Sequence, residues 1–239
     1  DWSSDVCSSD LIDDTAFDGP DQLKVTANEG SYAYDWAVEN GYIEKTDIPE
    51  YSPVTDFVIE NGVITGYTGQ GGIVIIPPAD VNGNSITGIG ESAFFQNSSI
   101  LKMVIPDGVT TIGASAFYFC GSLQNLEIPA SVNEISLGAF GYNGSLQSVN
   151  VAEDNESYCS VDGVLFDKSM QQLLYYPQGK RNQNSYTIPN GVREVGSFFM
   201  TNLKTLIIPD TVTTIQRAAF FQSSLTSITL PEGLGAIGD

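Results

Sequence analysis

The sequence of 239 residues contains no histidine, and its 9 Lys and Arg residues face 29 Asp and Glu residues, for a formal net charge of −20. Without histidine, Ser-His-Asp catalysis, Cys-His catalysis and His-ligated metal sites are excluded. The shortage of basic residues argues against binding to nucleic-acid phosphates or to an anionic membrane surface. Long apolar runs are lacking too. The longest surrounds Ile73–Ile76 and stops at Pro77, well short of the roughly 18 residues of a membrane-spanning helix.

Cysteine is also scarce, with Cys7, Cys120 and Cys159 only and no Cys-x-x-Cys motif. Zinc binding is therefore not expected, while a disulfide between Cys120 and Cys159 remains an alternative to a structural role for Cys120. The acidic run 153–156 offers oxygen ligands for Ca²⁺ but lacks the spacing of a calcium loop, so a solvated charge run is favoured. We predict no catalytic residue, no metal ligand and no cofactor.

What the sequence does contain is an internal repeat. An apolar residue followed by proline recurs at Ile105-Pro106, Ile128-Pro129, Ile188-Pro189, Ile208-Pro209 and Leu230-Pro231. An Ala-Phe pair recurs at Ala93-Phe94, Ala116-Phe117, Ala139-Phe140 and Ala219-Phe220, with 23 residues between the first three pairs. Repeats with periods of about 20–50 residues are typical of solenoids, propellers and arrays.

One repeat can be translated into local structure. Leu126 and Ile128 alternate with period 2, which places both side chains on one face of a short strand. Pro129 lacks a backbone N–H and is expected to end that strand. The segment 132–135 predicts a second extended piece, and Gly113–Cys120 predicts one or two helical turns whose Ala and Phe fill the coil. A single coil buries too few side chains to fold alone, so the coils must stack into a solenoid.

Irregular segments interrupt this array. Phe57–Tyr67 contains Asn-Gly between two apolar runs and predicts a two-residue-turn hairpin that caps the first coil. A second hairpin is predicted with residues 163–166 facing residues 173–176. The coil after Pro189 lacks the Ala-Phe pair, and Phe198 or Phe199 is expected to replace it.

The repeat phase also divides the chain into regions. Residues 54–239 are predicted to form one array that is truncated at its C-terminus, after a linker at 44–53. Residues 12–43 look like the end of a preceding array with a capping helix over 31–40. Residues 1–11 have no repeat phase, and their back-translation resembles a common sequencing adapter. We therefore treat them as an artefact and exclude them from fold reasoning.

The unit I-P-x-x-V-x-x-I-G-x-x-A-F-x-x-C-x-x-L at 105–123 resembles the BspA-like leucine-rich repeat of bacterial surface proteins. The stretches 158–180 and 30–41 resemble the irregular coil and the array-closing segment of that family. The resemblance covers residues 12–43 and 54–239. It implies a leucine-rich-repeat solenoid that is secreted or displayed on the cell surface, is often adhesive, and has no catalytic residues to transfer to this chain.

The leading functional hypothesis is a non-enzymatic module that binds a protein or glycan partner outside the cell. Recognition would use strand positions that do not support the core, namely Lys102, Val104, Gln124, Asn125, Glu127, Gln147, Ser148, Asn150, Lys204, Thr205, Ile207, Thr226, Ser227 and Thr229. The alternative is a passive spacer that displays another domain. Nucleic-acid binding and membrane insertion are not expected.

Overall fold

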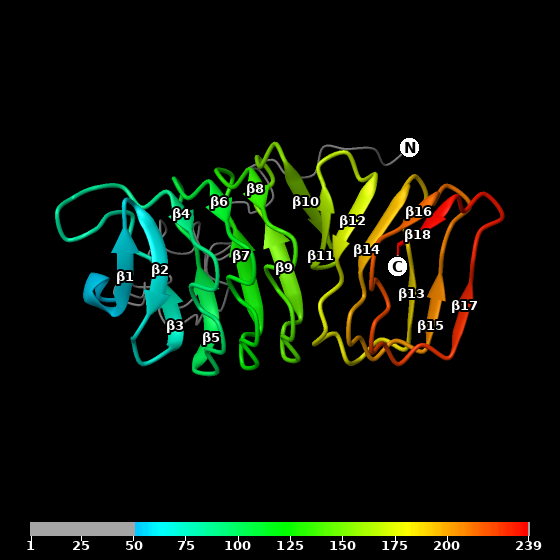
Figure 1. Cartoon of the computed structure of the whole chain (residues 1–239), viewed down its shortest axis with the longest axis horizontal. Coiled ribbons are helices and arrows are strands. Elements are labelled where there is room, and N and C mark those ends of the chain that lie inside the picture. The colour runs from blue at the N-terminus through cyan, green and yellow to red at the C-terminus, as the bar shows by residue number, and fades with distance from the viewer. Residues whose placement is uncertain (1–50, 239) are drawn as a thin grey trace, which may run out of the picture. The chain divides into compact units, whose positions relative to one another are not determined.

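The computed structural model describes residues 51–238, in which short strands follow one another as the stacked coils of a β-solenoid (Figure 1). This confirms the predicted solenoid of short strands with hairpin insertions. The predictions for residues 1–11, for the array end at 12–43 and for most of the linker at 44–53 lie outside the described residues. The coils run along the long axis from β1 at one end to β17 at the other.

One face of the first coils is a parallel sheet in the order β3-β5-β7-β9. Its strands are β3 (Gly72–Ile75), β5 (Ile100–Val104), β7 (Asn125–Ile128) and β9 (Ser148–Val151). In β7, Leu126 and Ile128 are buried, and Asn125 and Glu127 are partly exposed. The strand ends before Pro129, as expected. Period-2 alternation therefore separates side chains that support the core from side chains that remain available on the surface.

A second sheet, in the order β1-β2-β4-β6-β8, forms the next side of the same coils. Its strands are β1 (Phe57–Glu60), β2 (Val63–Tyr67), β4 (Gly88–Ile89), β6 (Thr111–Ile112) and β8 (Glu134–Ile135). A 3₁₀ helix, η2 (Val54–Asp56), precedes them. The predicted Asn-Gly hairpin is confirmed: β1 and β2 are antiparallel, with φ of 52° at Asn61 and 77° at Gly62. Because β2 pairs in parallel with β4, the hairpin covers the first coil.

The later coils contribute two further sheets, in the orders β10-β11-β12-β14-β16-β18 and β13-β15-β17. The first contains β10 (Tyr158–Val161), β11 (Val164–Asp167), β12 (Gln172–Tyr175), β14 (Glu194–Ser197), β16 (Thr214–Ile215) and β18 (Ala236–Ile237). The second contains β13 (Ser185–Thr187), β15 (Thr205–Ile207) and β17 (Ser227–Thr229). Phe166 pairs with Leu173 across β11 and β12, which confirms the second predicted hairpin.

The sequence prediction was wrong about the segment that closes each coil, which we call the arc. Gly113–Cys120 consists of turns, not helix, and η2 is the only helix in residues 51–238. The reason lies in the backbone, because φ is positive at Ser115 (55°) and again at Phe119 (62°). A left-handed residue interrupts the succession of right-handed residues that an α-helix requires.

The arcs are instead held together by hydrogen bonds from coil to coil. Backbone N–H groups two residues apart donate to carbonyls of the next arc, from Phe94 to Ala116, Gln96 to Tyr118, Phe117 to Ala139 and Phe119 to Gly141, with N···O distances of 2.8–2.9 Å. Neighbouring arcs thereby form a ladder, although most of their residues are not in strands. This ladder satisfies backbone groups that would otherwise be buried without partners.

Two hydrophobic cores fill the solenoid, and the β11–β12 hairpin separates them. Leu165 and Tyr175 pack into the first core, whereas Phe166 and Leu173 pack into the second. Leu165 and Phe166 are adjacent in β11 and point to opposite faces. The register shift between them skips Leu174 in β12, which lets Leu173 and Tyr175 face different cores as well. In the second core Phe198 is fully buried and its ring stacks on that of Tyr176 at 5.1 Å. Of the two candidates at 198 and 199, Phe198 therefore takes the place of the missing Ala-Phe pair.

Candidate functional site

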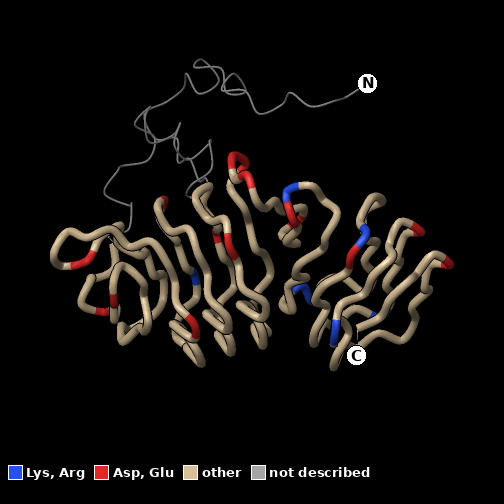
Figure 2. Tube along the Cα trace, turned by 45° about the horizontal axis from the view of Figure 1, so that its top comes forward, with Lys and Arg blue, Asp and Glu red and all other residues tan. Residues whose placement is uncertain are grey.

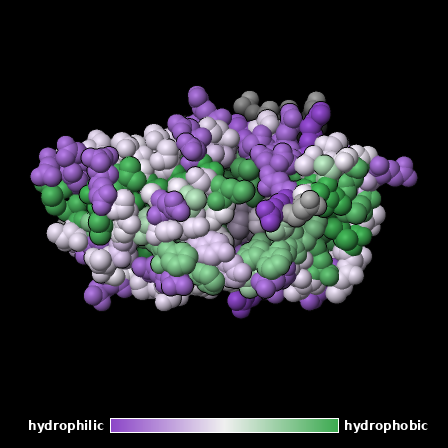
Figure 3. All heavy atoms as spheres, in the orientation of Figure 1, coloured by the Kyte–Doolittle hydropathy of each residue, from purple (hydrophilic) through white to green (hydrophobic). Residues whose placement is uncertain are grey.

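The sequence-predicted binding residues lie on the outer surface of the solenoid, and none of them is buried. Lys102, Asn125 and Ser148 lie side by side on β5, β7 and β9, and Val104, Glu127 and Asn150 form a second row beside them. Gln124 and Gln147 immediately precede two of these strands. We call these eight residues the strand face. In Figure 3, this region mixes hydrophilic and weakly hydrophobic residues.

The strand face is weakly cross-linked. Ser148 Oγ donates to Asn125 Oδ1 at 2.8 Å, and Lys102 Nζ lies 3.8 Å from Glu127 Oε1. The latter is an ion pair, and a pair this exposed contributes between about 0 and 1 kcal/mol. These side chains are therefore free to change partners at little cost.

The remaining predicted residues lie apart from the strand face, on the sheet that contains β15 and β17. Thr205 pairs with Ser227, and Ile207 pairs with Thr229. Lys204 and Thr226 precede the two strands, and Thr226 Oγ1 donates to the Lys204 carbonyl at 3.2 Å. Hydrophobic residues gather at this end of the molecule (Figure 3). Since the two groups belong to different sheets, the structure does not unite all the predicted residues in one patch.

The cysteines have structural surroundings. Cys120 and Cys159 are both free, so the alternative of a disulfide between them is wrong for this structure. Burial raises the pKa of the Cys120 thiol to about 12, and its Sγ donates to the Phe94 carbonyl at 3.0 Å. Burial also raises the pKa of Cys159. Neither thiol is activated as a nucleophile or as a metal ligand at neutral pH.

No three Cys, Asp or Glu side chains within residues 51–238 are grouped so that they could hold a metal ion. In the same part of the chain, no helix has the length and apolar composition needed to cross a bilayer.

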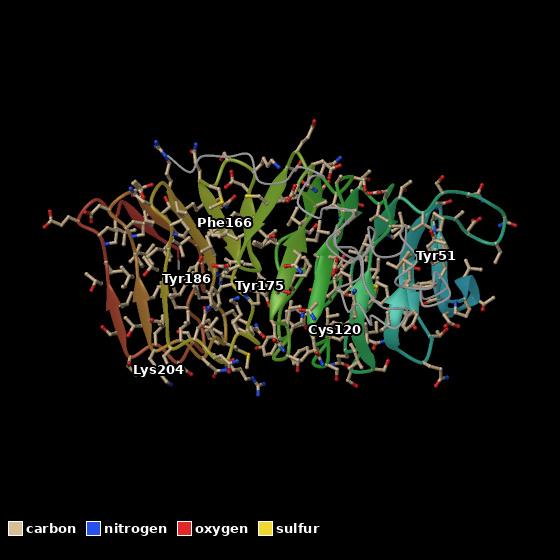
Figure 4. The ribbon with its side chains drawn as sticks, turned by 180° about the vertical axis from the view of Figure 1, so that it is seen from behind. Tyr51, Cys120, Phe166, Tyr175, Tyr186 and Lys204 are labelled. Atoms are coloured by element: carbon tan, nitrogen blue, oxygen red, sulfur yellow. The ribbon has the colours of Figure 1, made fainter. Side chains whose placement is uncertain are left out.

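Sequence reasoning missed a cavity of about 660 Å³ between the two halves of the solenoid. We call it the junction groove. It is lined by Tyr118, Ile135–Gly141, Tyr158, Leu165, Asp167, Gln172, Leu174, Tyr175, Gly196, Ser197, Phe199 and Gln216–Ala218. Tyr175, one of its lining residues, lies midway along the solenoid between Cys120 and Tyr186 (Figure 4). The signal in the sequence was the irregular segment between Val151 and Ile188, whose spatial consequence was not recognised.

The groove exists because β10 and β11 are inserted next to β8. Instead of a strand of the regular sheet, β8 meets a side chain, since the Ile135 N–H donates to Tyr158 Oη at 3.0 Å. In the coil of the hairpin, the chain continues from β12 into Pro177 and forms no arc like Gly113–Cys120. The arc that contains Phe140 and the one that contains Phe199 therefore face each other across a gap.

The gap interrupts the ladder of hydrogen bonds between arcs. By analogy with Phe117 and Phe119, the N–H groups of Phe140 and Tyr142 should donate to the next arc. Within residues 51–238 they have no acceptor, and the Phe199 carbonyl has no donor. The ladder resumes beyond the gap, where the Phe198 N–H donates to the Ala219 carbonyl at 2.7 Å.

Aromatic rings line the groove at Tyr118, Phe140 and Phe199, and the ring of Tyr142 lies next to this lining. The ring of Tyr142 packs against that of Phe199 with centroids 4.6 Å apart, and it also contacts Tyr118 at 5.1 Å. Phe199 in turn stacks on Phe221 at 5.7 Å. At the floor, burial raises the pKa of Tyr175 well above its usual value, and its hydroxyl forms no hydrogen bond of normal geometry.

The groove has one cationic and one anionic side chain. The Asp167 carboxylate is already engaged, because it accepts hydrogen bonds from the backbone N–H groups of Ser169 and Gln172. Arg217 is exposed and has no ion pair or side-chain hydrogen bond within residues 51–238. Six of the seven basic residues in the described part follow residue 160, and Figure 2 shows this concentration in the second half.

The family model described as the BspA type leucine rich repeat region matches residues 81–173 and 168–239, in six copies. The chain belongs to this family. BspA-type repeats therefore account for every regular coil from β4 onward, as the resemblance predicted. No curated protein sequence matches the chain.

Three solved structures share the fold. The pneumococcal vaccine antigen PcpA is 27% identical, with a TM-score of 0.53 over 68% of this chain and 51% of its own. A leucine-rich repeat protein from Eubacterium ventriosum is 22% identical, with a TM-score of 0.51 over 75% of this chain and 64% of its own. The T. pallidum leucine rich repeat protein TpLRR is 23% identical, with a TM-score of 0.52, and covers 79% of this chain and 86% of that one. The chain thus spans about half of the pneumococcal antigen.

Proposed function

We propose that this BspA-type repeat array is a non-enzymatic module of a secreted or surface-displayed protein that binds a protein or glycan outside the cell. The observation that carries the proposal is the strand face. Two rows of side chains lie in register on β5, β7 and β9, do not support the core, and are held by few contacts. An extended surface of this kind is how solenoids engage their partners.

Two further observations support the proposal. One structural relative, PcpA, is described as a pneumococcal vaccine antigen, which agrees with exposure outside the cell. The chain has a net charge of −20, so a neutral or basic partner surface is favoured and its attraction should weaken with salt.

The test replaces Asn125, Glu127, Ser148 and Asn150 together by Lys in the full chain. Binding of the fluorescently labelled chain to cultured epithelial cells and to bacterial cells is then measured by flow cytometry. We expect at least a tenfold loss of binding, because the substitutions add five positive charges to the face and replace its hydrogen-bond acceptors by donors. The melting curve should be unchanged, because none of these side chains is buried.

A matched control carries the same change in charge elsewhere. It replaces Asn133, Glu134, Gln171 and Asn182 by Lys, at exposed positions outside the strand face. Equal loss of binding in both variants would indicate a general charge effect, and full retention in the first variant would overturn the strand face as the binding surface. A wild-type chain that binds none of the cells would favour the alternative function, a spacer that displays another domain.

A further inference from the structure

The gap in the arc ladder has the hydrogen-bonding pattern of a missing strand-like segment. Phe140 and Tyr142 present N–H donors two residues apart on one side, and Phe199 presents a carbonyl on the other. The preceding arc has the same backbone shape, because φ is 62° at Phe119 and 57° at Tyr142. In that arc, the N–H groups of Phe117 and Phe119 do reach carbonyls of the next coil. The donors at the gap therefore face a position that another segment of backbone can occupy.

An extended peptide has the repeat that these donors require. Its alternate carbonyls point to one side and can accept from Phe140 and Tyr142, while an intervening N–H points to the other side, toward the Phe199 carbonyl. Backbone hydrogen bonds give affinity in this kind of recognition, and pockets for alternate side chains give specificity. A sugar ring could stack on the aromatic rings of the lining, but it has no such alternation of donors and acceptors.

The lining of the groove determines which side chains fit. Leu165 and Leu174 line it together with Leu137, whose side chain is 87% exposed. An apolar side chain placed among them removes their surface from water.

The charges of the groove select a carboxylate as the second feature of the ligand. Asp167 is occupied by its own loop, whereas Arg217 has no partner within residues 51–238. A free guanidinium pairs with a carboxylate through charge-assisted hydrogen bonds. The groove therefore has no net charge of its own, although the chain as a whole is strongly acidic, and its positive side chain is the one without a partner among the described residues.

We propose that the junction groove binds a short extended peptide of a partner protein, which replaces the missing arc and carries an apolar side chain near a carboxylate. This rests on the proposed function as a binding module, and it names the partner chemistry of a second site. The peptide would pair with Phe140, Tyr142 and Phe199 through its backbone, with its apolar side chain near Leu137 and its carboxylate on Arg217.

The test uses the full chain, immobilised, and a positional-scanning library of N-acetylated, C-amidated hexapeptides. We expect enrichment of peptides that combine an apolar residue with Asp or Glu. The best peptide is then measured by fluorescence polarisation. Leu137→Asp should weaken it at least tenfold, and Arg217→Glu should abolish the preference for Asp or Glu over Asn or Gln. Both positions are exposed, so both variants should fold normally.

Replacement of single backbone amides by esters provides a matched pair of probes, because it removes an N–H without adding bulk. Replacement of the amide whose N–H faces Phe199 should weaken binding at least tenfold, and replacement of an alternate amide, whose N–H faces the donors of Phe140 and Tyr142, should leave it unchanged. Equal effects of the two replacements, or absence of any enriched peptide, would overturn the proposal. Binding of a glycan on an array that is lost in Leu137→Asp, without peptide binding, would replace the peptide with a sugar as the occupant.

The two proposals can fail separately. If the four-lysine variant of the strand face loses cell binding and still binds the selected peptide, the two sites are independent. If the wild-type chain binds no cell but binds the peptide as described, the proposed adhesive role fails and the groove remains. If cell binding persists in Leu137→Asp and no peptide is enriched, the groove proposal fails alone.

Discussion

Replacement of Phe117 by Ala tests the arrangement of the core most directly. The side chain is fully buried in the interior of the first core. Its ring is stacked between those of Phe94, at 5.2 Å and an interplanar angle of 4°, and Phe140, at 6.1 Å and 24°. Removal of a buried Phe typically costs about 3–5 kcal/mol, and each aromatic pair adds about 0.5–1.5 kcal/mol beyond area burial. Because two such pairs are lost, we expect the free energy of unfolding to fall by about 5 kcal/mol.

The measurement is urea denaturation of the full chain followed by circular dichroism, analysed for the transition of the first core. Phe221→Ala is the matched control. Phe221 is 53% exposed and has one stacked neighbour, so its loss should cost about 1 kcal/mol or less. A change below about 1 kcal/mol for Phe117→Ala would refute the stacking of the arcs, because only an exposed ring can be removed at so small a cost.

Three other substitutions test separate features. Asn143→Ala should destabilise by about 1–3 kcal/mol in the same assay, because it removes the buried acceptor of the Cys120 N–H at 2.8 Å; the exposed Asn182→Ala should have no effect, and equal costs would contradict this role. Cys120→Ala should make the melting temperature fall less steeply above pH 9. Folding raises the pKa of this thiol from 9.0 to about 12, so the thiol stabilises the folded protein below pH 9 and loses that contribution as the pH rises toward 12. An unchanged dependence of the melting temperature on pH would rule this out. Gly179→Ala should lower the melting temperature, because a Cβ there would lie 2.4 Å from the Ser145 carbonyl carbon. Gly233→Ala should leave the melting temperature unchanged, because the nearest atom to its Cβ would be 3.7 Å away. A larger effect at Gly233 than at Gly179 would be inconsistent with the structure.

Much of the fold could be predicted because the same residue types recur at the same positions of successive repeats. Each Ile-Pro pair marks the end of a strand, since proline cannot donate to the sheet, and β7 does end at Ile128. The hairpin at Asn61-Gly62 follows from the preference of that pair for positive φ. Alternation along the strands likewise predicted that Leu126 would be buried and that Glu127 would stay on the surface.

The parts that could not be predicted depend on contacts between coils. The conformation of the arcs is fixed by hydrogen bonds to the next coil and by positive φ at Ser115 and Phe119. Neither Ser nor Phe is a residue type that favours a left-handed backbone, so the sequence does not predict it. The junction groove arises because the coil of the β11–β12 hairpin has no arc, and the absence of a segment leaves no motif in the sequence. Asp162-Gly163 was a turn signal of the same kind as Asn61-Gly62, and it would have revealed the β10–β11 hairpin that opens the gap.

The β11–β12 hairpin between the two cores determines how far a local disturbance of the packing can spread. Coils on one side share buried side chains with each other, but the two cores lie on opposite faces of β11 and β12. In a solenoid, stability is close to a sum over neighbouring contacts, so such a boundary divides the array into two cooperative blocks. Force applied to one end, or insertion or deletion of a repeat there, would then unfold or distort one block while the other stays folded.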